Sequence, residues 1–428
     1  MKLTIVGGGS TYSPELVHGL LERGSALGID TLVLHDPHRE RLGPVGAFCA
    51  RMADHMGSAS RVETTDDLQD ALVGADVVVI QIRVGGQQGR HQDIRLGLDH
   101  GLIGQETTGV GGFAKALRTI PVVLDIAQEV ARLCPEAWLL NFTNPSGMVT
   151  EALLRAGHTR TVGLCNVPIE MHMDIAKVLG RATEEVSLDW VGLNHLGWVR
   201  RVLVEGEDVL PGLIDAIEDK VSGPANLPEL SYPEGFLKAL GVIPSSYVRF
   251  FYAPEAMLAE IETKKQTRAE EVMVLEQELL KLYADPLQVE LPALLSKRGG
   301  AWYSRLAVNV IEALHSDEPS VHIVNTSNQG AIDGLPEDAS VEVPCKLSRS
   351  GVEPIDCGAV DPALLGLIQS VKAYERLGID AALSPTRERA LKALLAHPLV
   401  PNAHVASEVL DALVRRGLID ASAHKDGA

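Results

Sequence analysis

The sequence predicts an α/β fold, a Rossmann-type doubly wound parallel sheet followed by a second α+β domain. Three observations support this prediction. Short apolar runs alternate with helical patterns through the first half of the chain, a glycine-rich turn follows the first apolar run, and strand patterns become sparse in the second half. Parallel strands joined by helices are buried on both faces, so they form short and almost continuous apolar runs of this kind.

The first half contains the expected parallel sheet. Buried strands are predicted at Leu3–Val6, Leu32–Leu34, Val77–Ile82, Trp138–Asn141 and Thr161–Leu164. Helical periodicity separates them, over Pro14–Arg23, Glu40–His55, Phe113–Leu133 and Gly147–Arg155. Because ligands bind beyond the carboxyl ends of parallel strands, we expect the site among the residues that follow these runs.

The second half has long helices and few strands. Helices are expected near Gln266–Tyr283 and Pro362–Leu377, and strands at Val199–Val204, His322–Val324 and Ser340–Val343. A chain of 428 residues is long enough for two domains. We place the boundary after the Gly192–Leu196 stretch, which gives a first domain of residues 1–195 and an α+β domain of residues 196–428 for substrate binding, catalysis and oligomerisation.

Charge and composition exclude some classes of function. The net charge of −19 argues against non-specific binding to nucleic acid, which needs a basic surface. No apolar run approaches the ~20 residues that span a bilayer, and the five cysteines are too sparse for a disulfide framework. We therefore expect a cytoplasmic protein with neither a nucleic-acid nor a membrane partner. A few buried arginines could still create a local pocket for an anionic substrate.

The first strand ends in a turn that suits a dinucleotide, Gly7-Gly8-Gly9-Ser10-Thr11. Glycines allow the backbone to turn sharply and to approach a pyrophosphate, which then rests at the start of the following helix. Asp36 ends the second strand, where a carboxylate accepts hydrogen bonds from a ribose hydroxyl and repels a 2′-phosphate, which favours NAD over NADP. The alternatives are a tight turn between strand and helix and, for Asp36, a turn residue before Pro37.

Cys165 and His195 are candidate metal ligands. Each follows a predicted strand or strand-like run, so the sheet could bring them together. One thiolate and one imidazole are too few for a closed structural zinc site. They suit an open site that substrate hydroxyls complete around an octahedral divalent ion such as Mn²⁺. The alternative is that each is an ordinary buried residue.

Several motifs in the same order resemble glycoside hydrolase family 4, and in particular its 6-phospho-β-glucosidase branch, over nearly the whole chain. They are Gly7–Ser10, Gly104–Phe113, Asn141–Gly147, Cys165–Pro168, Gly192–His195, Arg268–Met273 and His322–Thr326. The resemblance implies a fold similar to lactate and malate dehydrogenases and bound NAD⁺ in the first domain. It also implies a divalent metal, usually Mn²⁺, a homodimer or homotetramer, and a phosphorylated disaccharide or β-glucoside as substrate.

The resemblance further implies hydrolysis without net redox change, an exception to two-carboxylate glycosidase chemistry. The sugar C3 hydroxyl is oxidised by hydride transfer to NAD⁺, and the ketone makes the C2 proton acidic. A base removes that proton, the C1–O bond breaks by elimination, water adds, and NADH reduces C3 again.

The roles implied by the family map onto single residues. Cys165 and His195 correspond to the metal ligands, and Tyr247 to the base at C2. The residues expected to contact the substrate are Asn144, Asn166, Asn194, Arg90 and Arg268, with the two arginines suited to a 6-phosphate. The residues themselves leave simpler roles open. Tyr247 could be a core aromatic residue, and both arginines could be solvated surface groups.

Asn166 departs from the α-specific members of the family, which carry Asp after the metal cysteine as an acid for the leaving group. An amide has no titratable proton to donate, and a β-linked substrate is therefore favoured. An α-linked or unphosphorylated glycoside remains an alternative. Two different classes of protein also stay open. An NAD-dependent hydroxy-acid dehydrogenase would need a His–Asp proton relay, and a catalytically silent NAD sensor would not need Cys165, His195 and Tyr247 together.

Overall fold

The computed structural model describes residues 1–217, 231–298 and 302–421. Its main sheet has nine strands in the order β13-β12-β11-β6-β5-β4-β1-β2-β3. The strands from β6 to β3 in this order are parallel, which is the arrangement of a dinucleotide-binding sheet. Their bounds are β1 Lys2–Val6, β2 Thr31–His35, β3 Arg61–Thr65, β4 Val77–Ile80, β5 Trp138–Asn141 and β6 Thr161–Gly163.

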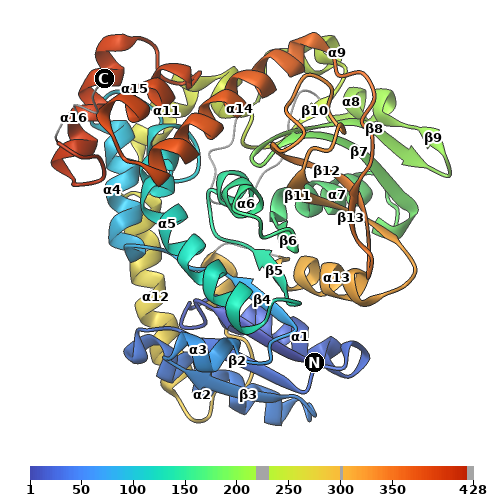
Figure 1. Ribbon diagram of the computed structural model, residues 1–428. Coiled ribbons are helices and arrows are strands. Elements are labelled where there is room, and N and C mark those ends of the chain that lie inside the picture. Colours follow the sequence, from blue (N-terminus) through green and yellow to red (C-terminus); the bar gives the residue numbers. More distant parts are fainter. Residues whose placement is uncertain (218–230, 299–301, 422–428) are drawn as a thin grey trace.

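Helices connect these strands and cover the sheet (Figure 1). They are α1 Ser13–Leu27, α2 Arg39–His55, α3 Leu68–Leu72, α4 Gly86–Leu98, α5 Gly109–Leu133, α6 Ser146–Arg155 and α7 Asn166–Val178. All five strands predicted for the first half are present. The sequence did not indicate β3, because its residues RVETT are polar and mostly exposed at the sheet edge. It also did not indicate α4, whose glycines lower helix propensity.

Three later strands extend the same sheet. They are β11 Ser320–Ser327, β12 Ser340–Ser348 and β13 Gly351–Pro354, and β11 pairs antiparallel with β6 at Asn325 and Gly163. A second, antiparallel sheet contains β7 Val186–Leu193, β8 Leu196–Val204, β9 Glu207–Asp208 and β10 Ile243–Pro244. The division after residue 195 stays a prediction, and this point lies in the turn of the β7–β8 hairpin.

The later helices pack against the first half of the chain. They are α8 Leu210–Ile217, α9 Phe236–Leu240, α10 Arg249–Tyr252, α11 Pro254–Thr263, α12 Arg268–Ala284, α13 Tyr303–His315, α14 Pro362–Leu383, α15 Arg387–Ala396 and α16 Ala403–Arg415. Helix α12 lies along α2 and α4, and α14 lies against α5 (Figure 1). In the described part of the chain, no helix is both long and apolar enough to cross a membrane.

Helix α12 starts at a capping box, which fixes the N-terminal end of the helix. The Thr267 side chain accepts a hydrogen bond from the Glu270 amide, and the Glu270 carboxylate accepts one from the Thr267 amide. Such a capping box satisfies two backbone donors that the first helical turn leaves without partners. The next residue after the cap, Arg268, is thereby held at a defined position.

A buried ionic network joins α14 to the first sheet. Lys372 Nζ lies 2.8 Å from Glu151 Oε2 and 2.5 Å from Glu375 Oε2, and all three side chains are almost completely buried. Glu151 Oε2 also accepts the backbone amide of Ser340 at the start of β12. Buried charges are tolerated only while they remain paired, so this network ties three elements together.

Replacing Lys372 by Ala should lower the free energy of unfolding by about 3–5 kcal/mol, because the buried Glu375 loses its cation and the buried Glu151 keeps only Arg376 at 3.3 Å. Urea unfolding measures this loss. Lys392→Ala is a matched control, since Lys392 and its partner Glu388 are mostly exposed, and it should leave the unfolding midpoint nearly unchanged. Equal midpoints for the two variants would contradict a stabilising role for the network.

Candidate active site

A cavity of about 900 Å³ opens at the carboxyl ends of the parallel strands. The predicted residues that line it are Gly7, Ser10, Asp36, Arg90, Asn144, Asn166, His195, Tyr247 and Arg268. Five predicted residues do not line the cavity, although each is next in sequence to a residue that does. They are Gly8, Gly9, Thr11, Cys165 and Asn194. A smaller cavity of about 530 Å³ adjoins it and shares Arg90, Glu106 and Arg268.

The glycine turn after β1 has no room for side chains. A Cβ at Gly7, where φ is +91°, would lie 2.8 Å from the Gln81 carbonyl oxygen, and one at Gly8 would lie 2.8 Å from the Leu34 side chain. A Cβ at Gly9 would lie 2.8 Å from Asp36 Oδ2. The turn therefore lies against the ends of β2 and β4, and its backbone borders the cavity.

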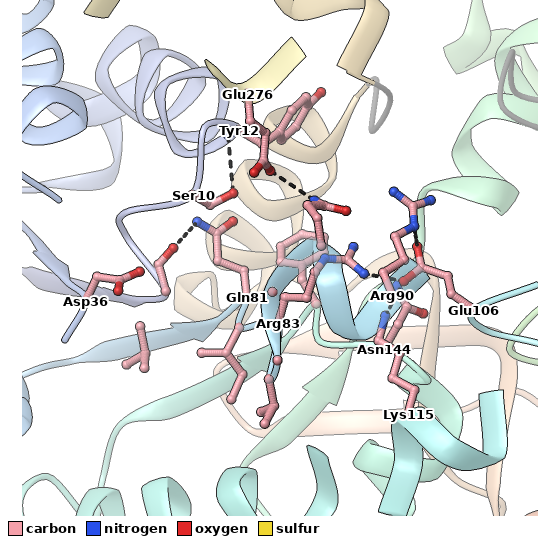
Figure 2. Close-up of a pocket in the computed structure, with 18 of the residues that line it drawn as sticks. Ser10, Tyr12, Asp36, Gln81, Arg83, Arg90, Glu106, Lys115, Asn144 and Glu276 are labelled. Carbon is pink, nitrogen blue, oxygen red and sulfur yellow. Dashed lines mark hydrogen bonds and ion pairs between the residues drawn. The ribbon is translucent and has the colours of Figure 1, made fainter. Parts of the chain in front are cut away.

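Asp36 has a structural contact as well as a place in the cavity wall. Its Oδ2 accepts the Gly9 amide at 3.1 Å, and its Oδ1 accepts the His38 amide at 3.0 Å. The carboxylate is thus fixed beside the glycine turn while it lines the cavity (Figure 2). Both interpretations of Asp36, turn residue and nucleotide contact, are compatible with this position.

A cluster of charges surrounds Glu106 in the opposite part of the cavity (Figure 2). Its Oε2 accepts hydrogen bonds from Lys115 Nζ, at 2.8 Å, and from Arg83 Nη1. Its Oε1 lies 2.8 Å from Arg90 Nε, and these two atoms form an ion pair without hydrogen-bond geometry. Burial alone would raise the pKa of Glu106, but the three cations hold it well below its usual value. Three cations against one carboxylate leave excess positive charge in the wall.

The cations in this cluster are affected by burial. The pKa of Lys115 is lowered to about 8, chiefly by burial and next by the charge of Arg83, while Glu106 opposes the change. Burial also lowers the pKa of Arg90 to about 10. The Arg90 side chain is only 10% exposed, so it is not a solvated surface group. Arg268 is more exposed at 24%, and it donates to Glu271 and to the Lys297 carbonyl while lining the cavity.

His195 and Tyr247 form a stacked pair in the cavity wall. Their ring centroids are 3.9 Å apart and the planes differ by 5°. His195 occupies the β7–β8 turn with φ of +61°, and its ring lines the cavity. Burial lowers the pKa of His195 to about 3, so its imidazole is neutral. Burial also raises the pKa of Tyr247 well above its usual value, with contributions from Cys165 and Glu106.

Cys165 lies at the N-cap of α7, close to two groups of the later chain. Burial raises the pKa of its thiol well above the usual value, and the nearby Glu342 raises it further. Asn194 donates to Glu342 Oε1 at 3.2 Å, and Asn325 donates to the same oxygen at 3.0 Å. Burial raises the pKa of Glu342 to about 7. Glu342 was not predicted from the sequence, although an acid between two valines of a strand is a signal of a buried polar contact.

The predicted metal ligands have suitable chemistry for a divalent ion. His195 Nδ1 is buried and has no hydrogen-bond partner among the described residues. A neutral imidazole binds a metal ion through one ring nitrogen. No group of three His, Cys, Asp or Glu side chains in the described ranges is arranged to hold an ion. The predicted set of Cys165 and His195 is smaller than such a group and would be completed by other ligands.

The chain matches the family described as Family 4 glycosyl hydrolase over residues 2–181, and the C-terminal domain of that family over residues 190–400. The chain belongs to family 4 of the glycosyl hydrolases. It is 42% identical over 422 residues to a probable 6-phospho-beta-glucosidase of Bacillus subtilis, covering 97% of this chain and 96% of that protein. It is 40% identical to the 6-phospho-beta-glucosidase of Escherichia coli, covering 94% and 91% of the two chains.

Solved structures agree with this assignment. The 6-phospho-beta glucosidase from Thermotoga maritima, solved with manganese, NAD⁺ and glucose-6-phosphate, has a TM-score of 0.89 at 37% identity and covers 98% of this chain and 99% of that one. A malate dehydrogenase from Plasmodium falciparum has a TM-score of 0.52 at 12% identity, covering 90% of this chain and 99% of that one, which shows the fold alone. The predicted family and the predicted dehydrogenase-like fold are confirmed.

Several cavity residues were not found from the sequence. Arg83 follows β4, Lys115 lies in α5, Glu276 lies in α12, and Arg298 and Tyr303 come from the later chain. Lys115 did carry a signal, because it is a single charge in an apolar stretch of helix. Arg298 and Glu276 carried none, since only tertiary packing brings them to the glycine turn.

Replacing Glu106 by Gln should lower the pKa of Lys115 below about 8, because the carboxylate is the group that favours the charged lysine. At pH 8 more of the lysine would then be neutral. NMR titration of lysine-labelled protein measures the shift, and Lys115→Arg identifies the resonance. Glu262→Gln, outside this cluster, should leave the resonance unchanged. An unaltered pKa in the Glu106 variant would show that the cluster is not electrostatically coupled.

Proposed function

We propose that this enzyme hydrolyses 6-phospho-β-glucosides with the help of NAD⁺ and a divalent metal ion, preferably Mn²⁺. The observation that carries the proposal is the cavity itself, in which excess positive charge around Glu106 shares one wall with a glycine turn and the His195–Tyr247 pair. Relatives at 39–42% identity are named 6-phospho-beta-glucosidases. A structural relative was solved with both cofactors and a sugar phosphate.

The glycine turn and Asp36 would hold NAD⁺, and Cys165 and His195 would hold the metal ion. When bound, NAD⁺ accepts the hydride from sugar C3 and later returns it, while the metal ion withdraws charge from the sugar oxygens and lowers the pKa of the nearby phenol. The neutral imidazole of His195 suits this role, since a protonated one could not bind a cation.

Tyr247 takes the proton from C2 and, after exchange with solvent, later delivers a proton to the same carbon. Stacking against His195 fixes the ring, so its hydroxyl has a defined direction toward the sugar. Burial favours the neutral phenol, and Arg90 is the protein cation that opposes this effect. Asn144, Asn166 and Asn194 would orient the sugar hydroxyls, with Asn194 held by its bond to Glu342.

Arg90 and Arg268 would bind the 6-phosphate. Glu106 contacts Arg90 through Nε, so the terminal nitrogens of this guanidinium are not used in that ion pair. Arg268 reaches the same cavity from the start of α12. Asn166 favours β-linked substrates over α-linked ones. A homodimer or homotetramer, and a cytoplasmic location, stay predictions.

Hydrolysis of p-nitrophenyl 6-phospho-β-glucoside should require NAD⁺ and Mn²⁺, and no NADH should accumulate, because the hydride returns to C3. The unphosphorylated glucoside should react far more slowly, since it lacks the charge that pairs with Arg90 and Arg268. Release of p-nitrophenol and absorbance of NADH measure the two quantities. Full activity after removal of both cofactors, or equal kcat/KM for the two glucosides, would contradict the proposal.

Replacing Tyr247 by Phe should lower kcat by ~10²–10⁴-fold, the usual cost of losing a general base. In D₂O the wild-type product should carry deuterium at C2, because elimination breaks the C2–H bond and a solvent-derived proton returns. NMR of the product and steady-state kinetics measure these effects. Tyr252→Phe is the matched control, since Tyr252 does not line the cavity. Retained protium at C2 would refute elimination, and a fully active Tyr247 variant would refute this base.

A further inference from the structure

The residue after Cys165 leaves the departing oxygen without an obvious proton source. On the proposed function, on which this inference rests, the aglycone leaves as an alkoxide that needs a proton. Asn166 lines the cavity but has an amide in place of a titratable group. A β-linked aglycone also leaves from the opposite face of the sugar ring to an α-linked one, so its proton donor need not occupy the same position.

A carboxyl group lies directly beside Asn166. Glu170 follows it by one turn of α7, and residues four apart share a helix face. Asn166 Nδ2 donates to Glu170 Oε1 at 2.5 Å. Glu170 itself does not line the cavity, so its carboxyl is one hydrogen bond behind the wall, and a single water molecule could relay its proton to a leaving group there.

The surroundings of Glu170 belong to the same cavity. Its charge raises the pKa of Tyr12, Tyr303 and Tyr247, all of which line the cavity, and that of Cys165. Helix α7 packs against α13, β7 and the short helix η1 Thr183–Glu185. The carboxylates on these elements each have a cationic partner. Glu184 pairs with Arg305, Glu185 with Arg181, Asp189 with Arg200 and Glu312 with Arg23.

We propose that Glu170 is the proton donor to the departing glycosidic oxygen. As Tyr247 removes the C2 proton and the C1–O bond breaks, that oxygen takes the carboxyl proton and leaves as the alcohol. When water adds, its oxygen bonds to C1, Glu170 accepts one of its protons, and Tyr247 returns a proton to C2. One water is consumed, and both side chains regain their starting states.

The protonation state of Glu170 suits this step. Its pKa is raised to about 7, chiefly by burial and to a smaller extent by Asp174, while the hydrogen bond from Asn166 opposes the change. A carboxyl with this pKa is partly protonated near neutral pH, as a general acid must be. Because the acid form is required, the reaction of a substrate with a poor leaving group should decline as pH rises through about 7.

The test compares leaving groups in Glu170→Gln. A p-nitrophenolate departs with little assistance, whereas the alcohol of cellobiose 6′-phosphate needs a proton. The variant should lose ~10²-fold or more in kcat/KM on the disaccharide and only a few-fold on the nitrophenyl substrate. The decline above about pH 7 on the disaccharide should also disappear. Asp174→Asn should retain activity on both and move that decline to lower pH, because removal of its charge lowers the pKa of Glu170.

Each outcome decides one claim. Equal losses on the two substrates, with NAD⁺ binding retained, would give Glu170 a purely structural role and overturn the inference. An unchanged pH profile in the Glu170 variant would overturn it too. Failure of the wild-type enzyme on both substrates would instead refute the proposed function.

Discussion

One buried carboxylate determines the electrostatics of the site. Glu106 contacts Arg83 after β4, Arg90 on α4 and Lys115 on α5. It therefore links three consecutive elements at the carboxyl ends of the parallel strands. Without it, three buried cations would repel one another in a medium of low dielectric constant. With it, they remain together and still leave net positive charge toward the cavity. A site for an anionic sugar is thus possible in a chain of net charge −19.

A second carboxylate joins the two halves of the chain. Glu276 on α12 accepts hydrogen bonds from Arg41 at 3.1 Å and from Gln87 and Arg298 at 3.0 Å. All three partners line the cavity. The cations hold the pKa of Glu276 below its usual value although burial would raise it. Arg41 also donates to the Gly9 carbonyl. The later chain therefore fixes the glycine turn from one side, while β2 and β4 support it from the other.

The sequence predicted the site residues whose positions depend only on short local segments of the chain. The glycine turn, Asp36, Asn144 and His195 follow strands or strand-like runs, and strand ends converge wherever parallel strands share a sheet. Contacts between distant segments were not predictable in this way. The pairing of Glu106 with Arg90 depends on how α4 packs, and β11–β13 join the first sheet because of one antiparallel pairing with β6. Nothing in the sequence indicated that Glu170 would meet Asn166, since α7 was not among the predicted helices.

Four carboxylates in or next to the cavity wall divide its chemistry, three of them buried and Glu170 partly buried. Glu106 and Glu276 are paired with cations, so they stay charged and position arginines. Glu170 and Glu342 have amide partners, and burial raises the pKa of each to about 7. Amides orient a carboxyl without stabilising its charge as strongly as a guanidinium does. One part of the cavity therefore keeps cations in place for an anion, and the part near Cys165, Asn166 and Asn194 is suited to transfer protons. The two parts remain coupled through Tyr247, because Glu106 raises the pKa of its phenol and Arg90 lowers it.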